Sequence, residues 1–192
     1  LTSESLGGRS ANRGQCARAC RLPYEIVCDG EDIDLQDQKY LLSPQDLAAF
    51  ELIPELIAAG VVSLKIEGRL KTPEYVANIT KHYRKAIDQA ISETQVSLSD
   101  EEVREMELSF SRGFSPGWLE GCDHKMLVPG LSSSKRGVSA GKAVQILSES
   151  VVVNSTIPLK AGDGIVFAGD RTQQAEQGGR IFEILQHGRR QQ

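Results

Sequence analysis

Twice along the chain, a pattern typical of a strand is followed by a pattern typical of a helix. This repetition constrains the fold more than any other feature. The short apolar run YLL (40–42) is followed by the pair SP (43–44), and the run VVSLKI (61–66) is followed by TPE (72–74). Serine or threonine caps a helix, and proline suits its first turn. Strand–helix units joined by short loops are typical of parallel α/β architecture, either an open sheet or a (β/α) barrel.

The two predicted helices differ in their regularity. The first begins at Ser43, kinks at Pro54 and ends before Gly60, because proline lacks an amide donor and glycine favours helix ends. The second begins after Thr72, and apolar residues recur at helical spacing over 75–91. Two strand–helix units do not close a barrel of about eight strands. The absence of an initiator methionine suggests a piece of a longer protein, with the earlier strands outside this sequence.

Other local signals divide the rest of the chain. YEIVCDGEDIDL (24–35) predicts a hairpin of two strands around Asp29-Gly30, since this pair tolerates positive φ angles. Ser99 is a candidate cap for a short helix. Beyond residue 136, short β-branched runs separated by turn signals predict an antiparallel sheet. We therefore predict the C-terminal part of a (β/α) barrel over 1–95, a connector over 96–136, and a small antiparallel β-barrel domain over 137–192.

Composition excludes some classes of protein. The chain has 40% hydrophobic and 25% charged residues and a net charge of -4, which is ordinary for a globular protein and argues against nucleic-acid binding by the whole surface. No apolar run reaches the roughly eighteen residues of a membrane span, and no signal-peptide pattern is present. We therefore expect a cytoplasmic protein without a membrane partner, in which cysteines are thiols or metal ligands and not disulfides.

The segment GGRSANRGQCARACR (7–21) joins two cysteines to four arginines and has almost no hydrophobic side chains. Positive neighbours lower the pKa of a thiol, and thiolates are the form that ligates iron. This segment therefore favours a metal or cluster role for Cys16 and Cys20, with a solvated basic loop bearing free thiols as the alternative. Cys28 and Cys122 are interpreted as small buried hydrophobic side chains.

Three stretches resemble the collagenase-like peptidase family: GRSANRGQCARACRLPYE, YLLSPQDL and SLKIEGRLKTPEYVANITKHYRKAID. The resemblance covers residues 1–95 closely, and the remainder is similar to the C-terminal β-barrel extension of the family. Members of this family hydroxylate bases of ribosomal or transfer RNA, and the family was first described as proteases. The resemblance implies a [4Fe-4S] cluster held by cysteines spaced C-x6-C-x15-C-x3-C. Cys16 and Cys20 match the last two ligands, and the other two would precede Leu1.

Further site residues are expected from their charge and position. Arg9, Arg13 and Arg21 would offset the charge of a cluster or bind RNA phosphate. IEGRLK places three further charges directly after the run 61–66, at the end of a barrel strand where barrel enzymes hold their substrates. These candidate substrate-binding residues are Glu67, Arg69 and Lys71. A local ion pair at a helix start is the alternative.

Three functions remain open at this point. The first is hydroxylation of an RNA base by the longer protein, this fragment being inactive alone. The second is proteolysis, although no HExxH or GxSxG motif is present and His82 is interpreted as an exposed or capping side chain. The third is a non-catalytic binding fragment. Because lost strands leave an exposed sheet edge, we also expect self-association through residues 40–66.

Overall fold

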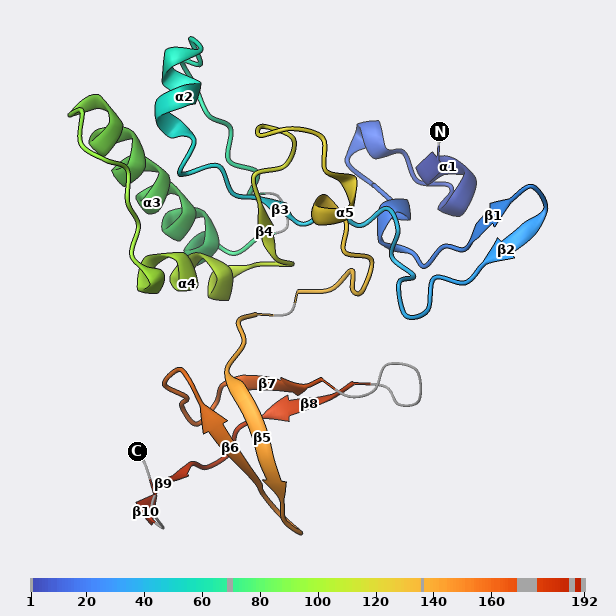
Figure 1. Ribbon diagram of the computed structural model, residues 1–192, viewed down its shortest axis with the longest axis vertical. Coiled ribbons are helices and arrows are strands. Elements are labelled where there is room, and N and C mark those ends of the chain that lie inside the picture. Colours follow the sequence, from blue (N-terminus) through green and yellow to red (C-terminus); the bar gives the residue numbers. More distant parts are fainter. Residues whose placement is uncertain (1, 69–70, 136, 169–175, 187–188, 191–192) are drawn as a thin grey trace. The chain divides into compact units, whose positions relative to one another are not determined.

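A computed structural model describes residues 2–68, 71–135, 137–168, 176–186 and 189–190 (Figure 1). The chain divides into two compact units, Leu1–Gly137 and Val138–Gln192. Among its described residues the first unit contains the following helices, 3-10 turns and strands: α1 (Thr2–Gly7), η1 (Ala11–Arg13), η2 (Ala19–Arg21), β1 (Ile26–Cys28), β2 (Glu31–Ile33), β3 (Asp46–Leu47), α2 (Ile53–Ala58), α3 (Pro73–Ile91), α4 (Asp100–Ser109), β4 (Phe114–Ser115) and α5 (His124–Leu127).

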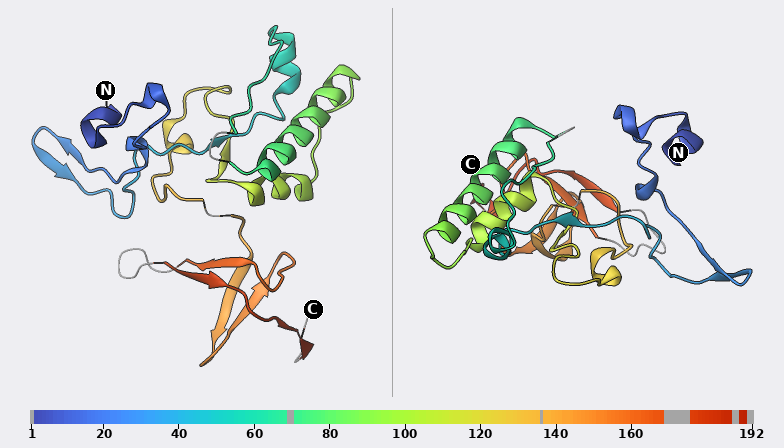
Figure 2. Two further views of the ribbon diagram at one scale, coloured as in Figure 1. Left: turned by 180° about the vertical axis from the view of Figure 1, so that it is seen from behind. Right: turned by 90° about the horizontal axis from the view of Figure 1, so that it is seen from above.

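The hairpin predicted over 24–35 is confirmed. β1 and β2 pair antiparallel, with Val27 opposite Asp32. Asp29 and Gly30 form the turn with φ angles of 53° and 87°, the positive values that a tight two-residue turn requires. Figure 2 shows that this hairpin reaches away from helices α3 and α4 of the same unit. Both of its faces are exposed.

The helix predicted from Ser43 to Gly60 is wrong over its first half. Only α2 is helical, and Pro54 lies in its first turn, where no amide donor is needed. The Ser43 hydroxyl accepts a hydrogen bond from the Arg21 guanidinium and caps no helix. β3 follows, and it pairs in parallel with β4. A contact between residues far apart in the sequence therefore replaces the predicted helical turn.

The buried strand predicted over 61–66 is also wrong. This segment forms no strand, residues 61–65 are exposed, and the Val62 side chain is 98% accessible. A strand needs a hydrogen-bonded neighbour, and none of the segments that the structure describes pairs with it. Self-association through residues 40–66 stays a prediction.

The core of the first unit lies where α2, α3 and α4 meet. α3 confirms the predicted second helix, and the Thr72 hydroxyl accepts a hydrogen bond from the Tyr75 amide. The Ala49 amide donates to the Tyr83 hydroxyl at 2.9 Å, which ties the chain before α2 to α3. The fully packed side chains of this core are Phe50, Ile53, Ile79, Ala86 and Met106.

A polar group joins α3 to α4 beside this core. His82 is 0% exposed, which corrects its interpretation as an exposed side chain, and its Nε2 lies 3.2 Å from Glu105 Oε2. Lys85 Nζ donates to both carboxylate oxygens of Glu102 at 2.7 Å. Ser99 and Glu102 form a capping box at the start of α4, which confirms the predicted cap. The contacts of His82 with Glu105 and of Lys85 with Glu102 thus join the two helices.

In the second unit, three hairpins pair antiparallel within the described residues: β5 (Gly141–Ile146) with β6 (Val151–Ser155), β7 (Gly164–Phe167) with β8 (Gln177–Arg180), and β9 (Leu185–Gln186) with β10 (Arg189–Arg190). Most side chains of β5, β6 and β8 are exposed. The described strands of the whole chain form two-stranded sheets, and the (β/α)-barrel and β-barrel architectures stay predictions. No described helix has the length and apolar character needed to cross a membrane.

The charge of Glu102 should stabilise the fold in a pH-dependent way. Hydrogen bonds from Lys85, followed by the Ser99 amide, lower the pKa of Glu102 from 4.5 to about 2. A carboxyl whose pKa is lower in the folded state stabilises above its unfolded pKa, and loses this effect as pH falls toward the folded value. Glu102→Gln, which preserves size and capping, should therefore lower the melting temperature by a few degrees at pH 7 and by less near pH 2.

Thermal unfolding followed by circular dichroism measures both effects. Glu101→Gln is the matched control, because it removes the same charge from the same helical turn at an exposed position. Equal losses for the two variants at every pH would contradict the assigned role of Glu102.

Candidate functional site

The cysteine–arginine segment folds as a loop of short turns. Arg13 lies in the 3-10 turn η1, which ends at Gly14 with φ 78°, and Arg18 precedes η2 with φ 56°. Cys16 and Cys20 are both exposed and carry no disulfide. The segment is therefore a solvent-facing loop with two accessible thiols.

Hydrogen bonds single out Cys16 within this loop. The Arg18 amide donates to Cys16 Sγ at 3.3 Å, and the hydroxyl of Ser3 lies 3.7 Å from the same sulfur. These two bonds, the amide first, lower the pKa of the thiol. Cys16 lines an open hollow of about 590 Å³. Its lining residues are Arg9, Gly14, Gln15, Cys16, Ala17 and Arg18.

The chemistry of this donor set suits an iron ligand. Thiolates hold iron-sulfur clusters, and amide-to-sulfur bonds together with nearby positive charge stabilise them. Cys28 and Cys122, interpreted as buried side chains, are exposed, so that interpretation is wrong. Among the described residues, no group of three or more His, Cys, Asp or Glu side chains is arranged to hold a metal ion. Cys16 and Cys20 would thus supply part of a ligand set.

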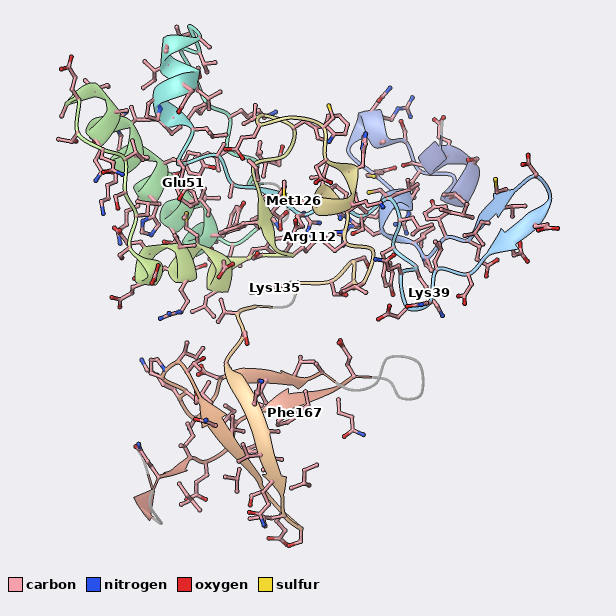
Figure 3. All side chains as sticks on the ribbon, viewed as in Figure 1. Lys39, Glu51, Arg112, Met126, Lys135 and Phe167 are labelled. Carbon is pink, nitrogen blue, oxygen red and sulfur yellow. The ribbon has the colours of Figure 1, made fainter. Side chains whose placement is uncertain are left out.

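A second feature, which we name the cationic cluster, consists of Arg21, Lys71 and Arg112 around Asp46. Arg112 donates to Asp46 Oδ2 through its amide at 2.9 Å and its Nε at 3.3 Å, and Nη2 pairs with Oδ1. Arg21 Nη1 donates to the carbonyl of Pro44 at 2.9 Å. Figure 3 shows Arg112 between helices α3 and α4 on one side and the N-terminal segment on the other.

Lys71 lacks a direct counter-ion in this cluster. Its ammonium lies over the ring of Phe110 and 5.3 Å from the ring centre of Tyr75. Burial, followed by the nearby positive charges led by Arg112, lowers the pKa of Lys71 from 10.5 to about 8, against the opposing effect of Asp46. Within the part of the chain that the structure describes, no carboxylate lies within ion-pairing distance of Lys71.

The structure brings some sequence-predicted residues together and leaves others apart. Arg21 and Lys71 join the cationic cluster, and Arg9 lines the hollow at Cys16. Arg13 and Glu67 are exposed, and Arg69 lies outside the described residues. Burial is the main cause of the raised pKa of Tyr75, whose ring lies beside Lys71, and the charge of Glu67 helps to raise it.

Arg112 was missed by the sequence analysis. It reaches the site because the parallel pairing of β3 with β4 brings Arg112 to Asp46, 66 residues away in the sequence. Nothing local in SRGF, the sequence around it, indicates this contact.

Peptidase family U32 matches residues 1–128. The chain belongs to this family. The U32 chain is 37% identical over 171 residues to a 23S rRNA 5-hydroxycytidine synthase of Escherichia coli, covering 85% of this chain and 26% of that protein. A collagenase of Porphyromonas gingivalis is 33% identical over 175 residues, with 85% of this chain and 46% of that protein covered.

A third U32 relative is the tRNA hydroxylation protein P1 of Bacillus subtilis, 33% identical over 127 residues, which are 63% of this chain and 30% of that protein. The chain therefore spans less than half the length of each of these relatives. No solved structure matches it.

The lowered pKa of Lys71 predicts an unusually reactive amine. At pH 8 about half of such a side chain is neutral, against less than about 1% of a lysine with an ordinary pKa. Trace labelling with acetic anhydride at pH 8, read by peptide mass spectrometry, should modify Lys71 several-fold faster than Lys81. Lys81 is the internal reference because its side chain is 67% exposed. Slower labelling of Lys71 than of Lys81 would contradict the assigned environment.

Proposed function

We propose that this U32 chain is part of a cytoplasmic RNA-base hydroxylase and supplies two of the four cysteine ligands of a [4Fe-4S] cluster. The two proposed ligands are Cys16 and Cys20. The names of two relatives, which refer to hydroxylation of ribosomal and transfer RNA, support the substrate class. The substrate base and the complete activity belong to the whole protein, of which the chain spans a part.

One observation carries the cluster assignment. The Cys16 sulfur accepts an amide hydrogen bond from Arg18 and lies beside the Ser3 hydroxyl, and both lower its pKa within an arginine-rich loop. These contacts favour the thiolate, which is the state that binds iron. When bound, such a cluster carries electrons one at a time, at a potential tuned by hydrogen bonds to its sulfurs and by local charge.

The remaining site residues have proposed roles in holding RNA. Arg9, Arg13 and Arg21 provide guanidinium groups that bind phosphate oxygens in pairs, and Lys71 provides a point charge. Glu67 and Arg69 are proposed to orient the substrate, Arg69 from outside the described residues. In this proposal the chain's own side chains bind and orient RNA, while the cluster supplies redox chemistry.

Proteolysis is the second candidate, and the collagenase relative is the observation that favours it. A protease needs an activated nucleophile or a metal-bound water. His82 is buried on α3, and its Nε2 contacts Glu105 of α4. The hydroxylase proposal therefore gives a role to more of the described site residues than the peptidase proposal does. A non-catalytic binding fragment would keep the cationic cluster but would not need the low-pKa thiol.

Deletion of the complete gene should abolish hydroxylation of one base in ribosomal or transfer RNA. Nucleoside mass spectrometry of both RNA classes measures the loss, and the wild-type gene should restore it. A gene carrying Cys16→Ala should restore none, whereas Cys122→Ala should restore all of it, since Cys122 matches no proposed ligand. Unchanged hydroxylation in the deletion strain would refute the proposed function.

The cluster itself is tested separately from activity. The complete protein, purified without oxygen, should bind about four irons per chain and show the visible absorption of a thiolate-bound cluster. Cys16→Ala and Cys20→Ala should each lose this absorption and most of the iron. The matched control is Cys28→Ala, a change of another exposed cysteine only eight residues beyond Cys20. Retention of the cluster in Cys16→Ala would remove this residue from the ligand set.

A further inference from the structure

We propose that the cationic cluster of Arg21, Lys71 and Arg112 is a binding site for one phosphate group of the RNA backbone. The inference rests on the proposed function for the identity of the ligand. It goes beyond that function by assigning a role to Arg112 and by bringing three side chains from separate segments into one site.

The cationic cluster carries more positive charge than the carboxylate of Asp46 neutralises. The nearby carboxylate of Asp46 has both of its oxygens already bonded to Arg112. Arg21 bonds to a hydroxyl and a carbonyl, and Lys71 lies over aromatic rings. Neither has a carboxylate within ion-pairing distance in the described ranges. Charge balance at this place therefore calls for an anion.

The three side chains are held in position before any ligand arrives. Asp46 fixes the Arg112 guanidinium, whose carbon lies 5.3 Å from the centre of the Phe110 ring. The same ring supports the Lys71 ammonium, and Ser43 with Pro44 anchors Arg21. A preorganised site loses less side-chain entropy on binding than a flexible surface does. This arrangement distinguishes the cluster from isolated surface lysines.

The cations also disfavour one another, and an anion would relieve this. Burial is the main cause of the lowered pKa values of Arg21 and Lys71, and Arg112 lowers both further. Opposite charge placed among them favours their charged forms. Guanidinium groups pair with phosphate oxygens bidentately and an ammonium adds a point charge, so two arginines and a lysine suit a phosphate.

Among the possible sources of this phosphate, the position of the site favours RNA. Arg21 directly follows Cys20, so a phosphate held here would place its nucleotide beside the proposed cluster loop. Backbone phosphate contacts set the register of a nucleic acid without reading its sequence. A free phosphate or a small carboxylate would use the same charges, and the experiment separates these sources.

The test measures binding of a fluorescent single-stranded RNA to the 192-residue chain by anisotropy over a series of salt concentrations. Each phosphate contact on a single strand contributes about 0.7 to the slope of log affinity against log salt. Lys71→Gln should weaken binding several-fold at low salt and reduce the slope by about this amount. Lys71→Arg, which keeps the charge, should keep the slope.

Lys81→Gln is the matched control, because it removes the same charge from an exposed position on α3 and should leave the slope unchanged. Arg21→Gln tests the site through a second side chain and should reproduce the slope change, even if Lys71→Gln proves unstable in thermal unfolding. Equal slopes for wild type, Lys71→Gln and Arg21→Gln would overturn the inference.

Two further outcomes separate this inference from the proposed function. If Lys71→Gln leaves RNA binding unchanged but abolishes binding of inorganic phosphate in phosphorus NMR, the site takes a small anion and the RNA assignment is wrong. If the wild-type chain does not bind RNA, the inference also fails. The proposed function is judged independently in either case, by the loss of base hydroxylation in the deletion strain.

Discussion

The contact between Asp46 and Arg112 is the interaction on which the first unit depends. It joins the segment before α2 to the segment after α4, where β3 and β4 pair in parallel. Each of the two side chains is 22% exposed, so removal of either would leave a poorly solvated charge behind. Breaking such a pair costs more than the pair itself contributes, because the remaining charge has lost its partner. The pair also fixes the side chain around which the cationic cluster forms.

Charge is distributed unevenly over the first unit. The residues that pack α3 against α4 form ion pairs, whereas the cationic cluster has an excess of positive charge. Between α3 and α4, carboxylates and cations neutralise each other through Lys85 with Glu102 and Lys81 with Glu105. At the start of α3, Lys71 precedes the Thr72 cap and lies near the positive charge of Arg112 as well as the carboxylate of Asp46. Ion pairs in the middle of α3 hold the helices together, and in our proposal the cations near its start bind a phosphate.

Features that depend on near neighbours could be predicted from the sequence. Thr72 before a proline, Ser99 three residues before Glu102, and Asp29-Gly30 between two strands each specify a local geometry, and the structure contains all three. The family resemblance was likewise confirmed, since it rests on contiguous motifs.

Features that depend on distant partners could not be predicted. The segment after Ser43 reads as helix by itself, but Arg21 takes the Ser43 hydroxyl and β4 pairs with β3. The run 61–66 has strand composition but no described pairing partner. Arg112 belongs to the same class, because only the parallel pairing of β3 with β4 places its guanidinium beside Asp46.

The proposed site has two parts, the cysteine–arginine loop and the cationic cluster. Of these, the cationic cluster would serve relatives that act on different RNA classes. Proteins named for ribosomal and for transfer RNA hydroxylation both align with this chain. The phosphate backbone is common to every RNA, whereas the edges of the bases are not. A cationic cluster within the U32 region of residues 1–128 therefore suits a contact that all these substrates offer. A base must leave its stack before an enzyme can modify it, and a fixed phosphate beside Cys20 would hold the strand while it does so. Selection of the particular base would then fall to other surfaces of the complete proteins.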